Sequence, residues 1–298
     1  MMSIPKESES IINLLVEEEK IKLKDFLKEK VEISSRLFKK LIKQNNIYIN
    51  DSLLGDIYYV TSGDVVTIVL EDEKAVYEPQ KMDLDVIYED LDILVINKKP
   101  RILVHPTKNH PNNTLTNGIQ YYFQSKSINK KVRLVNRLDR DTSGILVVAK
   151  NSYGHQQMAK QFTEGIEKKY IAVVKGILRK DHGIIDLPIG KEKDGVKNIV
   201  IDTGKESITE YKVIEKLKNS TIVELKIITG RTHQIRVHLS HINHPIIGDI
   251  LYGGDSELID RQALHSYYLK FKTPRKHEEI KLVAELPKDM KELINNLK

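Results

Sequence analysis

Residues 136–144, with the sequence Asn-Arg-Leu-Asp-Arg-Asp-Thr-Ser-Gly, form a dense polar loop between two strand-like runs, Arg-Leu-Val and Ile-Leu-Val-Val-Ala. A loop held between two buried strands is a rigid support for reactive groups. Outward from this loop, strand-like runs at 170–176 and 221–228 alternate with the helical stretch 152–162, without a fixed repeat. The alternation predicts one large mixed domain of the α+β class.

Three kinds of chemistry compete for this loop. Residues 141–144, Asp-Thr-Ser-Gly, are similar to an aspartic-protease loop. The protease motif, however, is Asp-Thr/Ser-Gly, one residue shorter, and it needs a second copy, which this sequence does not contain. A glycosidase would use Asp139 and Asp141 as a pair, although two residues so close in a loop have no fixed separation. The third hypothesis is a single ionised carboxylate held by arginines.

A second polar cluster spans residues 230–239, Gly-Arg-Thr-His-Gln-Ile-Arg-Val-His-Leu. Thr232 is predicted to cap a helix that begins here. Four histidines in and after the cluster suggest a metal site on spacing alone: His233, His238, His241 and His244. Two features argue against a metal site. The histidine run contains no thiol and no acidic residue, and His233 and His238 are five residues apart instead of the four of a helical metal-binding pair. Hydrogen-bonding or core histidines are therefore favoured, and no metal is expected.

The charge of the chain is concentrated near its N-terminus. Residues 20–43 contain nine Lys or Arg and three Asp or Glu, a local charge of +6 that equals the formal net charge of the whole sequence. Apolar residues recur there at helical spacing, and Ser34 offers a cap between two short amphipathic helices. Two β-rich runs follow at 47–50 and 65–70. This arrangement predicts a small α/β module with a basic face.

Composition excludes several classes of protein. The 298 residues suffice for about two domains, and the absence of Cys excludes disulfides, thiolate metal sites and a cysteine nucleophile. The acidic residues among the first twenty positions argue against a signal peptide and against a transit peptide. No apolar run approaches the roughly 20 residues that span a bilayer. We therefore expect a cytoplasmic protein without a membrane partner.

The N-terminal module resembles the ribosomal-protein-S-four-like RNA-binding domain, called the S-four-like domain below. The resemblance covers about residues 20–70 and rests on the Leu-x-x-Phe-Leu opening at Leu23, the Ser-Arg start of the second helix and the Gly-Asp-Val-Val before the last strand. Asn45 and Asn46 stand where the family usually has a glycine. The resemblance implies contact with structured RNA through basic side chains, namely Lys22, Lys24, Arg36, Lys39, Lys40 and Lys43.

The remaining motifs resemble the RluA family of pseudouridine synthases. Residues 136–144 match its His-Arg-Leu-Asp-x-x-Thr-Ser-Gly motif, 168–172 match Lys-x-Tyr-x-Ala, and 230–238 match its third motif almost letter for letter. Residues 97–106 look like its opening Asn-Lys-Pro to His-Pro segment, and 264–274 fit its closing Leu-His stretch. Four ordered motifs at compatible intervals make this resemblance specific, and it spans nearly the whole chain.

The resemblance implies both a fold and a reaction. The fold is the pseudouridine synthase fold, a mixed, mostly antiparallel sheet with flanking helices, at residues 83–298, joined by a linker at 73–82 to a small α/β S-four-like domain at 15–72. The reaction isomerises uridine in RNA without redox change or added water, so no cofactor and no metal are required. Large-subunit ribosomal RNA is favoured as the partner, transfer RNA is the alternative substrate, and we expect a monomer.

The resemblance also assigns roles in the reaction. Asp139 would be the essential carboxylate, which either attacks the anomeric carbon of the ribose or takes a proton from the adjacent carbon. Arg236 would pair with Asp139, and Tyr170 would stack on the detached uracil. Arg137 would enter the base stack where the target uridine is flipped out.

Further residues are assigned to substrate binding and packing. Leu138 and Ile235 are expected to pack beside the carboxylate, and Arg231 and His105 are expected to contact RNA. Asn136 replaces the family's usual His, which removes any titratable group at that position, while Asp139 itself is intact. A catalytically silent RNA-binding factor, in which the Asp-Arg pair is only structural, is the alternative from another class.

Overall fold

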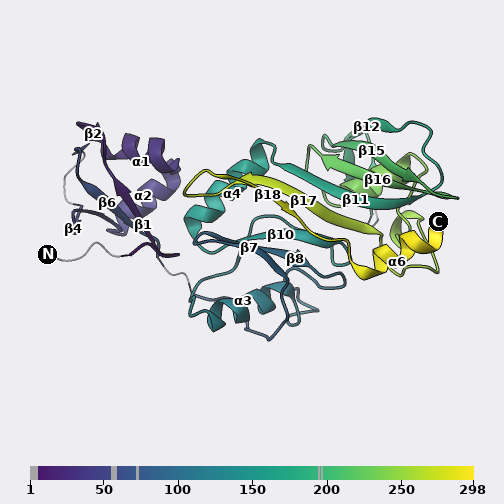
Figure 1. The fold of residues 1–298 in the computed structure, drawn as a ribbon, viewed down its shortest axis with the longest axis horizontal. Helices are drawn as coiled ribbons and strands as arrows, with labels where there is room; N and C mark the ends of the chain where they lie inside the picture. Colours follow the sequence, from purple (N-terminus) through teal and green to yellow (C-terminus); the bar gives the residue numbers. More distant parts are fainter. Residues whose placement is uncertain (1–5, 55–58, 72–73, 194, 196) are drawn as a thin grey trace.

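The computed structural model describes residues 6–54, 59–71, 74–193, 195 and 197–298. A four-stranded sheet near the N-terminus and a ten-stranded sheet in the rest of the chain dominate the fold. Figure 1 shows the N-terminal module, defined here as described residues 6–71, at one end of the molecule beside the larger main body, residues 74–298.

The N-terminal module packs two helices on an antiparallel sheet of strand order β1-β6-β3-β4. Leu23, Phe26 and Leu27 are buried in its core, as their helical spacing predicts. The Ser34 side chain accepts a hydrogen bond from the Leu37 amide, which confirms the predicted helix cap. The elements of the module are β1 (Ile11–Leu15), β2 (Ile21–Lys22), α1 (Leu23–Val31), α2 (Ser35–Lys43), β3 (Ile47–Ile49), β4 (Ser52–Leu53), β5 (Tyr59–Val60) and β6 (Val65–Val69).

The sheet of this module begins before residue 15, where the sequence placed the start of the domain. Strand β1 pairs antiparallel with β6 from Ile11 opposite Val69 to Leu15 opposite Val65. Such a long-range pairing leaves no local signal in a short strand. The predicted boundary at residue 72 and the first linker residue, 73, lie outside the described residues. Residues 74–82 contain no helix or strand.

The main body contains the ten-stranded sheet, with β12-β15-β16-β11-β17-β10-β8-β7 as its central path, β18 paired to β17 and β9 paired to β10. Its strands are β7 (Val86–Glu89), β8 (Ile93–Lys98), β9 (Arg133–Leu134), β10 (Ser143–Ala149), β11 (Glu167–Lys175), β12 (His182–Asp186), β15 (Ile208–Lys216), β16 (Ser220–Ile227), β17 (Leu264–Lys272) and β18 (Glu279–Val283). All pairs are antiparallel except β10 with β17. This mixed, mostly antiparallel sheet confirms the predicted α+β class.

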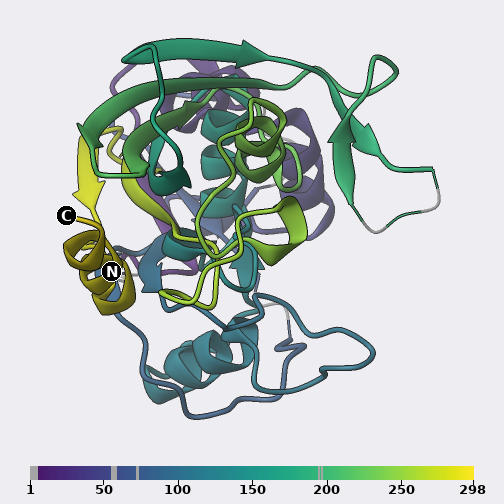
Figure 2. The same cartoon turned by 90° about the vertical axis from the view of Figure 1, so that its right-hand side faces the viewer.

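Helices and one hairpin flank this sheet. The helices are α3 (Leu115–Ser125), α4 (Ser152–Glu164), α5 (Gln234–His241), the single 3-10 turn η1 (Ile250–Tyr252) and α6 (Lys288–Leu297). Figure 2 shows a hairpin, β13 (Ile189–Lys191) with β14 (Asn198–Val200), projecting from one side of the main body. Within the described residues, no helix combines the length and apolarity needed to cross a membrane.

The parallel pairing of β10 with β17 places the polar loop 136–144 at the centre of the sheet. The two strands pair only at Ser143 with His265 and at Gly144 with Ser266. Gly144 has a φ of +115°, and a Cβ there would lie 2.2 Å from the Ser266 carbonyl oxygen, so a side chain would force the strands apart. Because β10 starts directly after the loop, the loop lies where the two halves of the sheet meet.

Buried polar contacts join the N-terminal module to the main body. Arg275, from the turn after β17, forms a bidentate pair with Asp92 at 2.9 and 3.1 Å and donates to the carbonyls of Ser8 and Ile11 at 2.7 Å. Tyr153 of α4 is 1% exposed and belongs to the hydrophobic core of the module. The apolar and polar contacts together fix the module against α4.

Candidate active site

The Asp139 loop is anchored on both sides of the carboxylate. Leu138 is buried in the main hydrophobic core, and the Thr142 amide donates to the Asp139 carbonyl at 3.2 Å. The Asp139 side chain is 30% exposed, and the Arg137 side chain before it is exposed at the surface. The loop therefore presents a carboxylate to a partly open space while its backbone is fixed.

Arg236 in the first turn of α5 faces this carboxylate. Its Nη1 donates to Asp139 Oδ2 at 3.1 Å, and its Nε and Nη2 donate to Asp249 at 2.7 and 2.8 Å. The side chains of Arg236 and Asp249 are 9% and 1% exposed. Burial would lower the pKa of Arg236, but the hydrogen bonds and charges of Asp249 and Asp139 outweigh it, so this pKa lies above its ordinary value. The guanidinium thus stays charged between two carboxylates.

Tyr252 and His233 complete this polar cluster. The Tyr252 ring lies 5.0 Å from the Arg236 guanidinium carbon, and its hydroxyl is 3.0 Å from His233 Nδ1. The other ring nitrogen of His233, Nε2, is 3.7 Å from Asp139 Oδ2. Burial lowers the pKa of His233 below 6.5 in spite of the Asp139 charge, so this imidazole is neutral at pH 7.

Tyr170 approaches the same space from strand β11. The register between β11 and β17 shifts between Lys169 and Tyr170, and an irregularity of this kind redirects a side chain within a sheet. Tyr170 is 7% exposed, and burial raises the pKa of its phenol to about 12. It therefore offers a neutral aromatic surface near the carboxylate.

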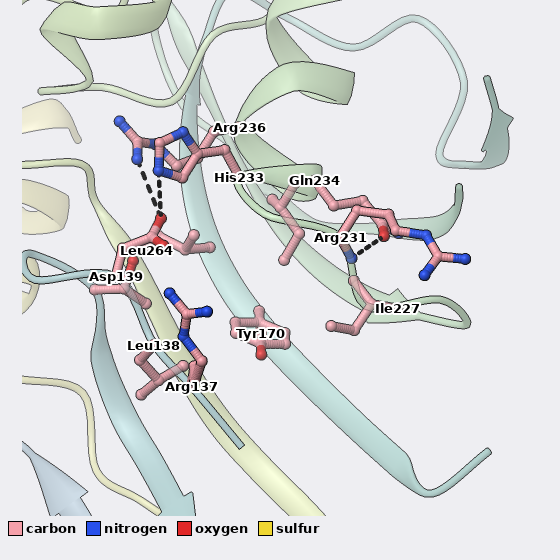
Figure 3. Close-up of a pocket in the computed structure, with 12 residues that line it drawn as sticks. Arg137, Leu138, Asp139, Tyr170, Ile227, Arg231, His233, Gln234, Arg236 and Leu264 are labelled. Carbon is pink, nitrogen blue, oxygen red and sulfur yellow. Dashed lines mark hydrogen bonds and ion pairs between the residues drawn. The ribbon is translucent and has the colours of Figure 1, made fainter. Parts of the chain in front are cut away.

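Asp139, Arg236, His233 and Tyr170 line one pocket, shown in Figure 3. The space between the lining residues, including the part open to solvent, is about 400 Å³. In Figure 3, Asp139 faces Arg236 and His233, while Arg137 and Tyr170 lie on the opposite side. The lining residues are Arg137, Leu138, Asp139, Thr142, Tyr170, Ile227, Arg231, His233, Gln234, Ile235, Arg236 and Leu264.

The structure brings together seven of the residues proposed from the sequence: Arg137, Leu138, Asp139, Tyr170, Arg231, Ile235 and Arg236. His105 does not line the pocket; it is exposed, and its pKa is lowered by partial burial and by the nearby charge of Arg137. The proposed RNA-contacting cations of the module are all exposed on β2, α1 and α2, away from the pocket lining: Lys22, Lys24, Arg36, Lys39, Lys40 and Lys43.

The prediction that Thr232 caps α5 is wrong. The helix begins at Gln234, and the residue before it, His233, has a φ of +58°. The Gln234 side chain accepts the Arg231 amide at 3.0 Å, which closes a tight turn ahead of the helix. This turn, and not a cap from Thr232, precedes the helix. It directs the His233 side chain towards the pocket.

Three of the four histidines of the metal hypothesis, His233, His238 and His244, contact different partners. His238 is buried between Thr209 and the Leu187 carbonyl, at 2.9 and 3.0 Å, and His244 contacts the Lys175 carbonyl at 2.8 Å. Asn136 also serves the scaffold, because its amide bonds the backbone of Ile145 and Val147 in β10.

Sequence reasoning missed Asp249 and Tyr252, and it gave His233 no role in this site. A signal for Asp249 exists, because it is the only charged residue in the apolar run Pro-Ile-Ile-Gly-Asp-Ile-Leu-Tyr at 245–252. A carboxylate in such a run needs a buried partner. The partner, Arg236, is identified only by the fold.

Comparisons with known proteins show the family to which the chain belongs. Residues 92–241 match the family model described as RNA pseudouridylate synthase. The chain is 39% identical over 264 residues to the uncharacterized RNA pseudouridine synthase YlyB of Bacillus subtilis, with 86% of this chain and 87% of that protein covered. It is 36% identical over 289 residues to the ribosomal large subunit pseudouridine synthase D of Buchnera aphidicola, covering 90% and 91%.

A solved structure gives the same assignment. The human RNA pseudouridylate synthase domain containing 1 superposes with a TM-score of 0.59 at 27% identity, and the match covers 74% of this chain and 97% of that one. The family resemblance drawn from the motifs and the fold expected from it are thereby confirmed. The chain belongs to the RNA pseudouridylate synthase family and is an RNA pseudouridine synthase of the RluA type.

Proposed function

We propose that this enzyme converts uridine to pseudouridine in large-subunit ribosomal RNA, with Asp139 as the reacting carboxylate. The single observation that carries the proposal is the Asp139 carboxylate held at 3.1 Å by the buried Arg236 in the pocket that Tyr170 also lines. Relatives at 34 to 36% identity that are named ribosomal large subunit pseudouridine synthase D support the choice of RNA.

The chemistry needs one ionised carboxylate. The bond between ribose C1′ and uracil N1 breaks, the uracil turns within the pocket, a bond forms between C1′ and C5, C5 loses its proton and N1 gains one, so the overall reaction is an isomerisation. Asp139 either bonds to C1′ and is later displaced, or takes the proton of C2′ and returns it. In both cases the carboxylate must be charged and correctly directed at the start.

Arg236 provides that direction. The buried Asp249 fixes two edges of its guanidinium, which leaves Nη1 to hold Asp139 Oδ2. Two carboxylates around one guanidinium leave the cluster with a net charge of −1, so Asp139 is oriented without being fully neutralised. Neutral His233 adds no further positive charge beside the carboxylate.

Tyr170 and Arg137 are suited to hold the flipped nucleotide. A uridine in a duplex must leave its stack to reach a pocket, which costs a few kcal/mol. Stacking on an aromatic side chain such as Tyr170 returns about 1–3 kcal/mol per base. The exposed Arg137 lies beside the pocket opening, where its planar guanidinium can stack in the vacated position.

The N-terminal module is proposed to be the S-four-like domain that holds structured RNA. Its six candidate cations are exposed on one pair of short helices and the strand before them. Because Lys and Arg release counterions from phosphates, binding through this face should weaken steeply with salt.

The test is to map pseudouridines at nucleotide resolution in ribosomal and transfer RNA from cells with and without the gene. Loss of one or more sites in large-subunit ribosomal RNA is the expected result, and complementation with wild type should restore them. Complementation with Asp139→Ala should restore none. A change confined to a transfer RNA would overturn the proposed substrate.

A further inference from the structure

Three side chains from two other parts of the chain hold the backbone directly after Asp139. Lys98 Nζ, from the end of β8, donates to the Arg140 carbonyl at 2.8 Å. Arg261 Nη1, from the loop before β17, donates to the Asp141 carbonyl at 3.0 Å. Gln262 Nε2 donates to the Thr142 hydroxyl at 3.1 Å. Three consecutive loop residues are therefore fixed by buried donors.

Arg261 is the most constrained of these donors. Its side chain is 1% exposed, and its Nε and Nη2 form a bidentate pair with Asp289 at 2.6 and 2.8 Å. Asp289 lies in the first turn of α6, the C-terminal helix seen in Figure 1. The Nη1 group also donates to the carbonyl of Gln262, at 3.0 Å. The guanidinium thus links α6, the start of β17 and the Asp139 loop.

The position of this link decides what it can do. Thr142, at the end of the gripped segment, donates its amide to the Asp139 carbonyl at 3.2 Å, so movement of the Asp141 carbonyl is transmitted to Asp139. The Arg261 charge is balanced by Asp289, and Arg261 does not line the pocket. Its influence on the reaction must therefore be geometric and not a direct contact with uridine.

We propose that Arg261, held by Asp289 of α6, is a positioning residue that fixes the Asp141 carbonyl and thereby directs the Asp139 carboxylate towards Arg236. The inference rests on the proposed role of Asp139. It makes the C-terminal helix part of the support of the active site, although the described residues of α6 do not line the pocket.

The test uses single-turnover rates at saturating RNA, with an RNA that the wild type modifies, and dissociation constants from filter binding. Arg261→Met should lower the rate constant about 100-fold, because a misplacement of about 1 Å costs that much, while RNA affinity stays within about twofold. Arg261→Lys keeps the charge but cannot form the planar bidentate pair, so it should lose about 10-fold. Asp289→Asn should lose about 10-fold for the same reason.

Arg275→Met is the matched control. Arg275, whose side chain is 11% exposed, also pairs bidentately with a carboxylate, Asp92, and donates to two carbonyls, but it does not touch the Asp139 loop. The Arg275→Met substitution should lower the melting temperature and leave the saturated rate within about twofold of wild type. If Arg261 were only structural, the Arg261→Met variant would give this same result. All rates are measured where circular dichroism shows each variant folded.

The outcomes separate the two proposals. Wild-type rates for the folded Arg261 variants would overturn the positioning role, and if neither variant folds, a wild-type rate for Asp289→Asn does so. If Asp139→Ala retains full activity, the proposed role of Asp139 is wrong, and the positioning inference that rests on it is wrong as well. If Asp139→Ala is inactive while the Arg261 and Asp289 variants are unaffected, only the positioning inference fails.

Discussion

Replacing Asp249 by Ala tests the electrostatic support of the site most severely. Asp249 is 1% exposed and supplies two of the three hydrogen bonds that Arg236 makes to carboxylates. Removing one partner of a buried ion pair leaves an uncompensated charge and costs about 3–5 kcal/mol. We therefore expect Asp249→Ala to lower the free energy of unfolding by about that amount.

The same substitution should also slow the reaction. Without Asp249, the Arg236 guanidinium can turn and pair fully with Asp139, which moves the carboxylate and neutralises it. A displacement of about 1 Å costs about 100-fold in rate. Urea unfolding followed by circular dichroism gives the stability, and single-turnover pseudouridine formation gives the rate, measured at a temperature where the variant is folded.

Asp260→Ala is the control for this experiment. Asp260 pairs with Arg101, but the two side chains are 69% and 63% exposed, so the loss should be about 0–1 kcal/mol. If Asp249→Ala is no less stable than Asp260→Ala, the buried pair does not carry the energy assigned to it. If its rate equals that of wild type, Asp249 does not orient Arg236 for the reaction.

Three further predictions concern other parts of the molecule. Burial lowers the pKa of His265 from 6.5 to about 4, so stability that is complete above pH 6.5 should fall by about 3 kcal/mol as the pH drops towards 4, and urea titrations of wild type and His265→Asn should differ in this window. Substituting Arg36, Lys39 and Lys43 by Gln should reduce the slope of log affinity against log salt by about 2–3 without changing the saturated rate; an unchanged slope would place RNA elsewhere. Tyr170→Phe should retain more activity than Tyr170→Ala, because the aromatic face is kept.

Local patterns predicted the parts of the fold that depend on neighbouring residues. The buried spacing of α1 and the Ser34 cap are examples, since both depend on residues within one or two turns. The pairing of β1 with β6 was missed because it joins segments far apart in sequence. The start of α5 was predicted wrongly for a different reason: the contact that organises the preceding turn is local, but it is made by the Gln234 side chain and not by Thr232.

The motifs located the pocket better than they described its support. Seven motif residues line it because the first motif leads into β10, the second lies in β11, and the third spans the turn after β16 and the first part of α5. Asp249, Tyr252 and Asp289 were not predicted, since each acts through a partner brought near by strand order. Their contribution depends on burial, which no local pattern measures.

The most direct test of the central claim is the rate of pseudouridine formation by Asp139→Asn at saturating RNA. Asn is nearly isosteric with Asp, so the Arg236 contact and RNA binding should persist while the ionised carboxylate is removed. We predict RNA affinity within about twofold of wild type and a rate reduced by at least about 10⁴-fold, as for the loss of a reacting group. A rate within about tenfold of wild type, at unchanged affinity, would contradict the role of Asp139 as the reacting carboxylate.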